Sequence, residues 1–208
     1  MKQHRFASHT PEEQRRLSNL GHIVEGLLLG AVGVLALLNS LGVAPWAATV
    51  WPILILVSGV LLLALIYPRH PFSDWPAIWH DAQQRQHTIM AAAIAMAGAT
   101  ELLRGRGLGL AYVWPGATIL IGVMFLIHEQ HGTSIAAAKA VRQHRILGLT
   151  VIAAGLLRAM ELITGANLSG LLWPLVLLAA AAQLILYREP EGAFETGHGE
   201  HSHHGESE

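Results

Sequence analysis

The sequence is built on a unit that occurs three times: an apolar segment beginning with histidine, a short loop, and a second apolar segment beginning with Trp-Pro. The leading histidines are His22, His87 and His144, and the tryptophans are Trp51, Trp114 and Trp173. Each histidine precedes its tryptophan by 29, 27 or 29 residues, and the tryptophans are 63 and 59 residues apart. Periodicity of this length is typical of repeated supersecondary units. Because each unit holds two apolar segments, we expect three tandem helical hairpins.

The apolar segments are long enough to cross a membrane. They cover about residues 20–41, 51–67, 87–103, 114–128, 144–163 and 173–187, in a chain that is 52% hydrophobic and only 13% charged. A helix needs roughly 20 residues to span a hydrocarbon core of about 30 Å. The sequence therefore predicts an all-α fold: a six-transmembrane-helix bundle at 20–187, made of the hairpins 20–67, 87–128 and 144–187.

Polar segments flank this domain. Residues 1–19 are an N-terminal arm, in which Thr10-Pro11-Glu12-Glu13 is a typical helix start. Residues 188–208 are rich in Gly, Glu and His, and we expect them to be disordered because nothing in them can form a core. Ten of the 13 Lys and Arg residues lie in the arm, the two long connections and the start of this tail. By the positive-inside rule, both termini are cytoplasmic.

The Trp-Pro pairs would then mark the opposite membrane boundary. An indole ring suits a membrane–water interface, and proline is well tolerated as the first residue of a helix. Inside the bilayer, helices associate through small residues. Gly26, Gly30 and Gly33, together with the alanines of 91–97 and 179–182, are the candidates for such contacts.

Histidines at the cytoplasmic side form the main candidate site. The repeat places His22, His87 and His144 at one depth, and His128 ends the fourth span at the same level, with His131 three residues later. Glu25 lies one turn deeper than His22 and should face the bundle, because a carboxylate facing lipid is costly. Imidazoles without thiolates suit copper(II), zinc or another divalent transition metal.

Two other interpretations of these histidines remain open. Two facing imidazoles could ligate a single haem b in an electron-transfer protein. Alternatively, the rings could hydrogen-bond to head groups or helix ends in a non-catalytic membrane subunit or assembly factor. A Soret band in purified protein would favour the haem protein, and stoichiometric copper or zinc that survives deletion of the tail would favour the metal site. Neither result would point to the non-catalytic subunit.

The tail carries a second group of candidate ligands. His198, His201, His203 and His204 alternate with carboxylates and small residues. Such a tract chelates first-row divalent ions, so we expect it to act as an accessory metal binder.

Ionisable residues also lie near the far ends of the spans. Glu101 with Arg104, and Arg158 with Glu161, are opposite charges three residues apart. We expect Glu101 and Glu161 to occupy equivalent positions in the second and third repeats. These charges are either structural ion pairs or the polar mouth of a path leading to the histidines.

Other classes of function find little support. The chain has no cysteine and a net charge of −1, which argues against thiol chemistry and nucleic-acid binding. No catalytic triad, phosphate-binding glycine loop or zincin motif is present, so enzymatic activity is not expected. The expected partners are the lipid bilayer, a metal ion, and a second copy or another membrane subunit.

Two stretches carry a family resemblance. The segments His128-Glu129-Gln130-His131-Gly132-Thr133-Ser134 and Tyr187-Arg188-Glu189-Pro190-Glu191-Gly192-Ala193 resemble small polytopic bacterial proteins grouped with copper-resistance membrane components. The resemblance covers mainly the second half of the chain. It implies a copper-linked protein of the bacterial inner membrane and no particular reaction. The chain departs from copper importers in lacking Met-rich or Cys ligands.

Overall fold

The computed structural model describes residues 10–66, 79, 82–108, 110–127 and 135–191. These residues form α-helices and no strand: α1 (Pro11–Ser40), α2 (Ala47–Ile66), α4 (Ala82–Arg104), α5 (Val113–Leu126), α6 (Ile135–Thr164) and α7 (Asn167–Leu186). Helices α1, α2, α6 and α7 are long and apolar enough to cross a membrane, and α5 is a shorter apolar helix. The predicted all-α class is confirmed.

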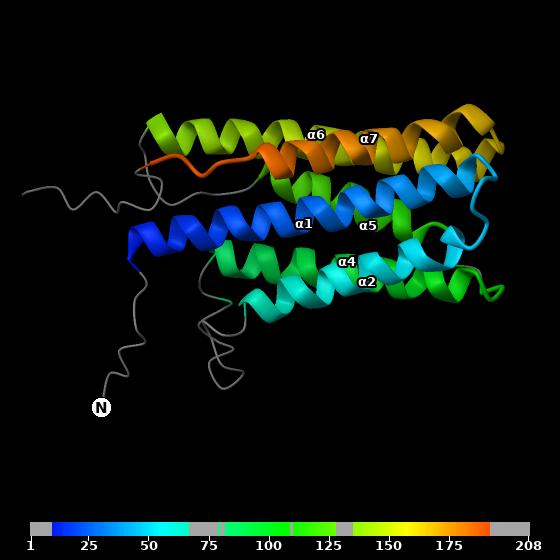
Figure 1. Cartoon of the computed structure of the whole chain (residues 1–208), viewed down its shortest axis with the longest axis horizontal. Helices are drawn as coiled ribbons and strands as arrows, with labels where there is room; N and C mark the ends of the chain where they lie inside the picture. Colours follow the sequence, from blue (N-terminus) through cyan, green and yellow to red (C-terminus); the bar gives the residue numbers. More distant parts are fainter. Residues whose placement is uncertain (1–9, 67–78, 80–81, 109, 128–134, 192–208) are drawn as a thin grey trace, which may run out of the picture.

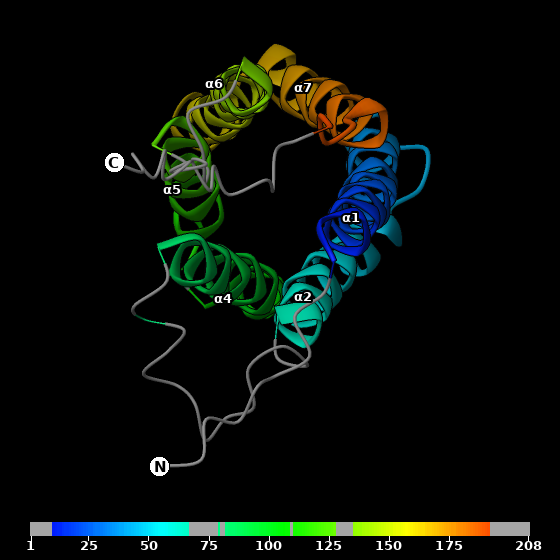
Figure 2. The same ribbon diagram turned by 90° about the vertical axis from the view of Figure 1, so that its left-hand side faces the viewer.

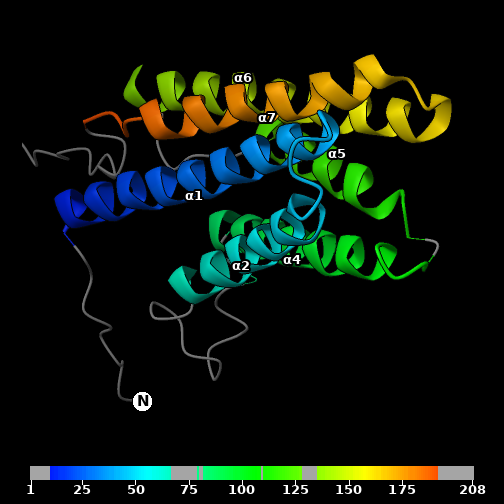
Figure 3. The ribbon, with the colours of Figure 1, turned by 45° about the vertical axis from the view of Figure 1, so that its right-hand side comes forward.

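The six helices form a closed ring, seen end-on in Figure 2. Within the hairpins, α1 packs on α2, α4 on α5 and α6 on α7; between them, α2 packs on α4, α5 on α6 and α7 back on α1. The starts of α1, α4 and α6 lie at one end, which we call the histidine end, together with the C-terminal end of α7 (Figure 1). The hairpin turns after α1, α4 and α6 lie at the other end, the tryptophan end (Figure 3).

Glycines at equivalent positions of the three repeats allow neighbouring hairpins to pack closely against each other. Gly33, Gly98 and Gly155 each stand eleven residues after the leading histidine of their repeat. A Cβ atom on these glycines would lie 3.2, 2.8 and 3.0 Å from the carbonyl oxygens of Pro174, Pro52 and Pro115, respectively. The same contact therefore joins α1 to α7, α4 to α2 and α6 to α5. The predicted packing of Gly26 and Gly33 is confirmed, because both lie against α7.

The predicted position of the Trp-Pro prolines is wrong: Pro52 and Pro174 lie inside α2 and α7, because the small and apolar residues before each tryptophan already belong to the helix. Trp51, Trp114 and Trp173 are buried in the bundle interior, where their rings meet. The indole of Trp46, in the first hairpin turn, is instead 61% exposed.

Helices α1 and α6 both begin earlier in the sequence than their apolar segments do. The predicted start of α1 is confirmed by a capping box, in which Thr10 Oγ1 accepts from the Glu13 N–H and Glu13 Oε2 accepts from the Thr10 N–H at 2.8 Å. Helix α6 begins at Ile135, so the basic segment before His144 and the fifth span are one helix.

The first residues of the predicted disordered tail pack on α1 instead. The Glu189 N–H donates to Asn19 Oδ1 at 2.7 Å, and Ser18 Oγ donates to Glu189 Oε2 at 3.0 Å. Arg15 also pairs with Glu191 at 3.1 Å. We call 188–191 the strap; residues 192–208 lie outside the described part of the chain.

We expect the strap to stabilise the histidine end. A variant ending at Tyr187 should unfold at a temperature a few degrees lower than the full chain, because it loses two hydrogen bonds of about 1 kcal/mol each. A variant ending at Glu191 should match the full chain. Thermal unfolding in detergent measures both, and equal melting temperatures for the two variants would contradict a stabilising strap.

Candidate functional site

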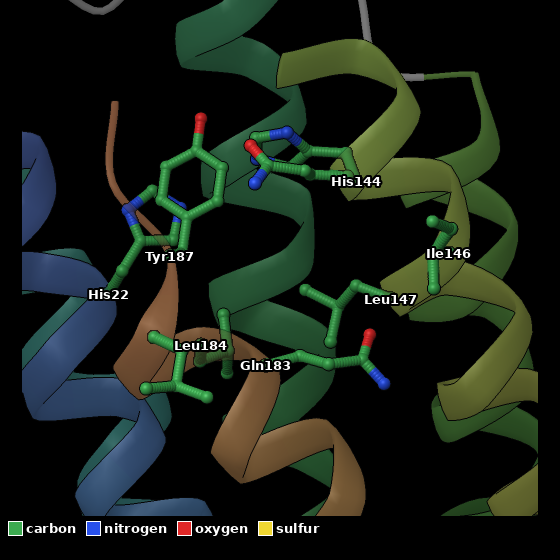
Figure 4. A pocket seen from close by; sticks show the side chains of 9 residues that line it. His22, His144, Ile146, Leu147, Gln183, Leu184 and Tyr187 are labelled. Carbon is green, nitrogen blue, oxygen red and sulfur yellow. The ribbon is translucent and has the colours of Figure 1, made fainter. Parts of the chain in front are cut away.

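Two of the three repeat histidines meet at the histidine end. The ring centroids of His22, on α1, and His144, on α6, lie 5.7 Å apart. Tyr187, directly after α7, completes the group, with centroids 4.3 Å from His22 and 5.2 Å from His144. Figure 4 shows the three rings side by side. The repeat therefore correctly predicts that leading imidazoles from different hairpins converge.

Each of these imidazoles is fixed by its own helix. His22 Nδ1 lies 2.7 Å from the carbonyl oxygen of Ser18, and His144 Nδ1 lies 2.9 Å from that of Ala140. A carbonyl oxygen only accepts hydrogen bonds, so Nδ1 of each ring carries the proton. In the neutral form of each ring the lone pair is then on Nε2, the tautomer found in many metal-binding histidines.

The other two described candidates lie around this pair. His87, on α4, is close enough to His22 for the two rings to interact electrostatically. Glu25 accepts a hydrogen bond from Ser58 Oγ on α2, and its Oε1 is buried with no hydrogen-bond partner among the described residues. The positions equivalent to Glu25 are Met90 and Leu147, both in the apolar core. The carboxylate thus distinguishes the first repeat.

The structure does not describe the remaining candidates. His128 and His131, and the tail residues His198, His201, His203 and His204, lie outside the described part of the chain. Over the described ranges, no group of three or more His, Cys, Asp or Glu side chains is placed to hold one metal ion. The described cluster is therefore a pair of imidazoles, with a third histidine and a carboxylate nearby.

A cavity of about 250 Å³ adjoins the imidazole pair. Its lining comes from α1, α6, α7 and Tyr187: His22, Gln143, His144, Ile146, Leu147, Gln183, Leu184, Leu186 and Tyr187. Four of these nine side chains are aliphatic. His22, His144 and Tyr187 lie together on one side of the cavity, and Gln183 lies apart from them (Figure 4). Gln183 is held away from the imidazoles by donating to Thr150 Oγ1 at 3.0 Å.

Sequence reasoning missed Tyr187 and Gln143 as site residues. The signal for Tyr187 was available, because it follows Trp173 at the same distance as His128 follows Trp114. A tyrosine at a histidine-equivalent position belongs to the same layer of the bundle. Gln143 immediately precedes the leading histidine, and Gln86 holds the same place in the second repeat.

At the tryptophan end, three indoles close the interior of the ring. The centroids of Trp51, Trp114 and Trp173 are separated by 5.6, 5.8 and 6.4 Å. The guanidinium carbon of Arg158 lies 5.3 Å from the Trp173 ring centroid, a cation–π contact. This group separates the charged residues at the tryptophan end from the apolar core.

The predicted ion pairs form, and a further contact links them. Arg104 Nε donates to Glu101 Oε1 at 2.7 Å, and Arg158 pairs with Glu161. Arg158 Nη2 also lies 3.5 Å from Glu101 Oε1, which joins α6 to α4.

The predicted equivalence of Glu101 and Glu161 is wrong by one helical turn. Counted from the leading histidines, whose register the interface glycines confirm, Glu101 corresponds to Arg158. Likewise, Glu161 corresponds to Arg104. The second and third repeats thus carry the same two charged positions with opposite signs, and at the first of them Arg158 meets Glu101 across the interior.

Comparison of the chain with protein-family models, with curated proteins and with solved structures found no match.

Proposed function

We propose that this chain is a membrane protein that binds a divalent transition metal ion, with copper as the leading candidate, between His22 and His144. The observation that carries the proposal is the pairing of two repeat-equivalent imidazoles whose Nδ1 atoms bond to backbone carbonyls. With Nδ1 protonated, the neutral ring carries its lone pair on Nε2, the atom through which such a histidine ligates a metal ion. The choice of copper rests on the family resemblance of the second half.

His87 and Glu25 are the proposed further ligands. In the described residues no three such side chains are placed to hold one ion, so in this proposal their side chains move towards the pair when the ion binds. The resulting mixture of nitrogen and oxygen donors suits copper(II) or zinc. In this proposal, Ser58 orients Glu25 through its hydrogen bond. His128, His131 and the four tail histidines are proposed as accessory ligands that raise the local concentration of the ion.

We infer that all six helices cross the membrane, with the histidine end in the cytoplasm. The ring supports this, because α4 and α5 lie alongside the four long apolar helices in it (Figures 1 and 2). The distribution of Lys and Arg supports the orientation. A bacterial inner membrane follows from the resemblance.

The cavity favours an ion over haem. Sites that enclose a drug-sized ligand have volumes of roughly 300–1,000 Å³, and a porphyrin is a large ligand of that kind. The cavity beside His22 and His144 measures about 250 Å³, and Tyr187 stacks against His22 within it. A metal ion needs no such volume.

The decisive variant is His22→Ala combined with His144→Ala, in a chain that ends at Glu191. This length removes the tail histidines and keeps the strap. We expect the parent chain to bind one copper(II) or zinc ion, and the double variant to bind it at least about 100-fold more weakly, because ligand loss exceeds the 10–100-fold cost of losing an outer partner. Calorimetric titration and elemental analysis measure the affinity and the stoichiometry.

Arg16 and Arg142 are exposed residues of α1 and α6 outside the cavity lining and serve as controls. Replacing both with alanine should leave the affinity unchanged. Equal affinities for the parent and the His22, His144 double variant would refute the site. A Soret band in the purified protein would favour the haem alternative, and neither metal nor haem would point to a non-catalytic subunit.

A further inference from the structure

Helix α6 carries positive charges on the outside of the ring. Lys139, Arg142 and Arg145 are exposed, whereas Ala140 and His144 are buried. At about 3.6 residues per turn, the three cations share one side of the helix and the buried residues lie on the opposite side. Because α6 is one member of a closed ring (Figure 2), its buried side faces the bundle and its charged side faces outwards. We call the three cations the basic face.

The basic face has no anionic partner within the described part of the chain. Its three side chains form neither an ion pair nor a hydrogen bond there. The described arginines of the other helices at the histidine end are engaged: Arg15 and Arg16 form ion pairs, and Arg85 and Arg188 donate to carbonyl oxygens. The unneutralised charge at this end is therefore concentrated on α6.

Apolar side chains continue the same side of α6 into the membrane. Ile146, Leu149 and Leu156 are exposed, and α6 is long and apolar enough to span a bilayer. The helix rises roughly 16 Å between Arg145 and Leu156, close to the roughly 15 Å that one leaflet contributes to a hydrocarbon core. A ligand that matches this surface has an anionic group next to an apolar chain of that length.

We propose that the outer side of α6 binds an anionic phospholipid of the leaflet at the histidine end. The guanidinium groups of Arg142 and Arg145 donate to the phosphate oxygens, a geometry for which their planar forks are suited. Lys139 adds a third positive charge. The acyl chains lie along Ile146 and Leu149. A zwitterionic lipid binds more weakly, because it carries its own cation beside the phosphate.

This lipid site goes beyond the metal site and requires no metal ion. It rests on the proposed insertion of α6 in a membrane. The metal titration is made in detergent without added phospholipid, so Arg142→Ala remains a control there. Failure of one proposal therefore leaves the other unaffected.

The test uses the full chain, freed of native lipid in a non-ionic detergent, and measures lipid binding by native mass spectrometry. The probes are phosphatidylglycerol and phosphatidylcholine with identical acyl chains, so only the head group differs. Each Lys or Arg near an anionic lipid surface contributes roughly fivefold to binding. We expect saturable binding of phosphatidylglycerol, at least about fivefold tighter than that of phosphatidylcholine. Equal affinities for the two lipids would overturn the proposal.

Two double variants locate the site. Arg142→Gln with Arg145→Gln should weaken phosphatidylglycerol binding about 25-fold, at roughly fivefold per charge, and remove the preference over phosphatidylcholine. Arg15→Gln with Arg16→Gln removes two charges at the same end that already have acidic partners, and should change the affinity less than about twofold. Unchanged binding in the α6 variant, or equal losses in the two variants, would overturn the proposal.

Inorganic phosphate separates a lipid site from a site for free phosphate. Added at the concentration of the lipid, it should not displace phosphatidylglycerol, because it lacks the acyl chains that lie along Ile146 and Leu149. Displacement under these conditions would show that the apolar side of α6 takes no part in binding, and would overturn the lipid site.

Discussion

Replacing Gly98 with alanine is expected to destabilise the bundle by about 3 kcal/mol, at the upper end of the usual cost of overpacking. The added Cβ would clash with the backbone nitrogen of Leu56 and would lie 2.8 Å from the carbonyl oxygen of Pro52. These are backbone atoms, so no side-chain rotation can relieve the clash, and α4 must move away from α2. Denaturant or thermal unfolding in detergent measures the loss.

The repeat supplies graded comparisons for this experiment. At Gly33 the nearest obstacles are side-chain atoms of Leu178 at 2.9 Å, which can move, so Gly33→Ala should cost clearly less than Gly98→Ala. Gly116 has no neighbouring atom within 4 Å of its added Cβ, and Gly116→Ala should be neutral or slightly stabilising. Equal losses at Gly98 and Gly116 would show that close approach of the helices is not what stabilises this interface.

Replacing Arg158 with leucine should be comparably severe, with a loss of about 3–5 kcal/mol. Arg158 is buried and contacts Glu161, Glu101 and the face of Trp173. Removing it leaves buried negative charge that a single remaining cation, Arg104, must balance. The unfolding free energy in detergent reports the effect.

A second substitution separates charge from packing. Arg158→Leu with Glu161→Leu removes one complete ion pair and leaves Glu101 with Arg104, so the double variant should be more stable than Arg158→Leu alone. As an exposed control, Arg16→Ala breaks the surface pair with Glu12 and should cost less than about 1 kcal/mol. A double variant no more stable than the single one would mean that Arg158 acts through packing on Trp173.

The architecture was largely accessible from the sequence, because histidine and Trp-Pro recur at nearly constant spacing. That spacing predicted three hairpins and the meeting of His22 with His144, and the charge spacing predicted the pairs of Glu101 with Arg104 and of Arg158 with Glu161. These features depend on register along a helix, which a repeat specifies directly.

The direction in which individual side chains point was harder to predict from the sequence. The second helices of the hairpins are apolar on all sides, so no amphipathic pattern shows which residues point inward. The tryptophans were therefore assigned to the membrane boundary, although their rings meet in the interior. The cavity at Gln143 depends on how closely α6 and α7 approach, and the strap depends on a contact between the two ends of the chain. Neither is encoded in local periodicity.

The contact of α7 with α1 has a consequence for biosynthesis. A closed circle of helices made from one chain cannot be completed until its last member has left the ribosome. Until then, the small-residue face of α1 that will receive α7, with Gly26 and Gly33, has no partner within its own chain. The first helix of the ring is thus among the last of its helices to find its full set of neighbours.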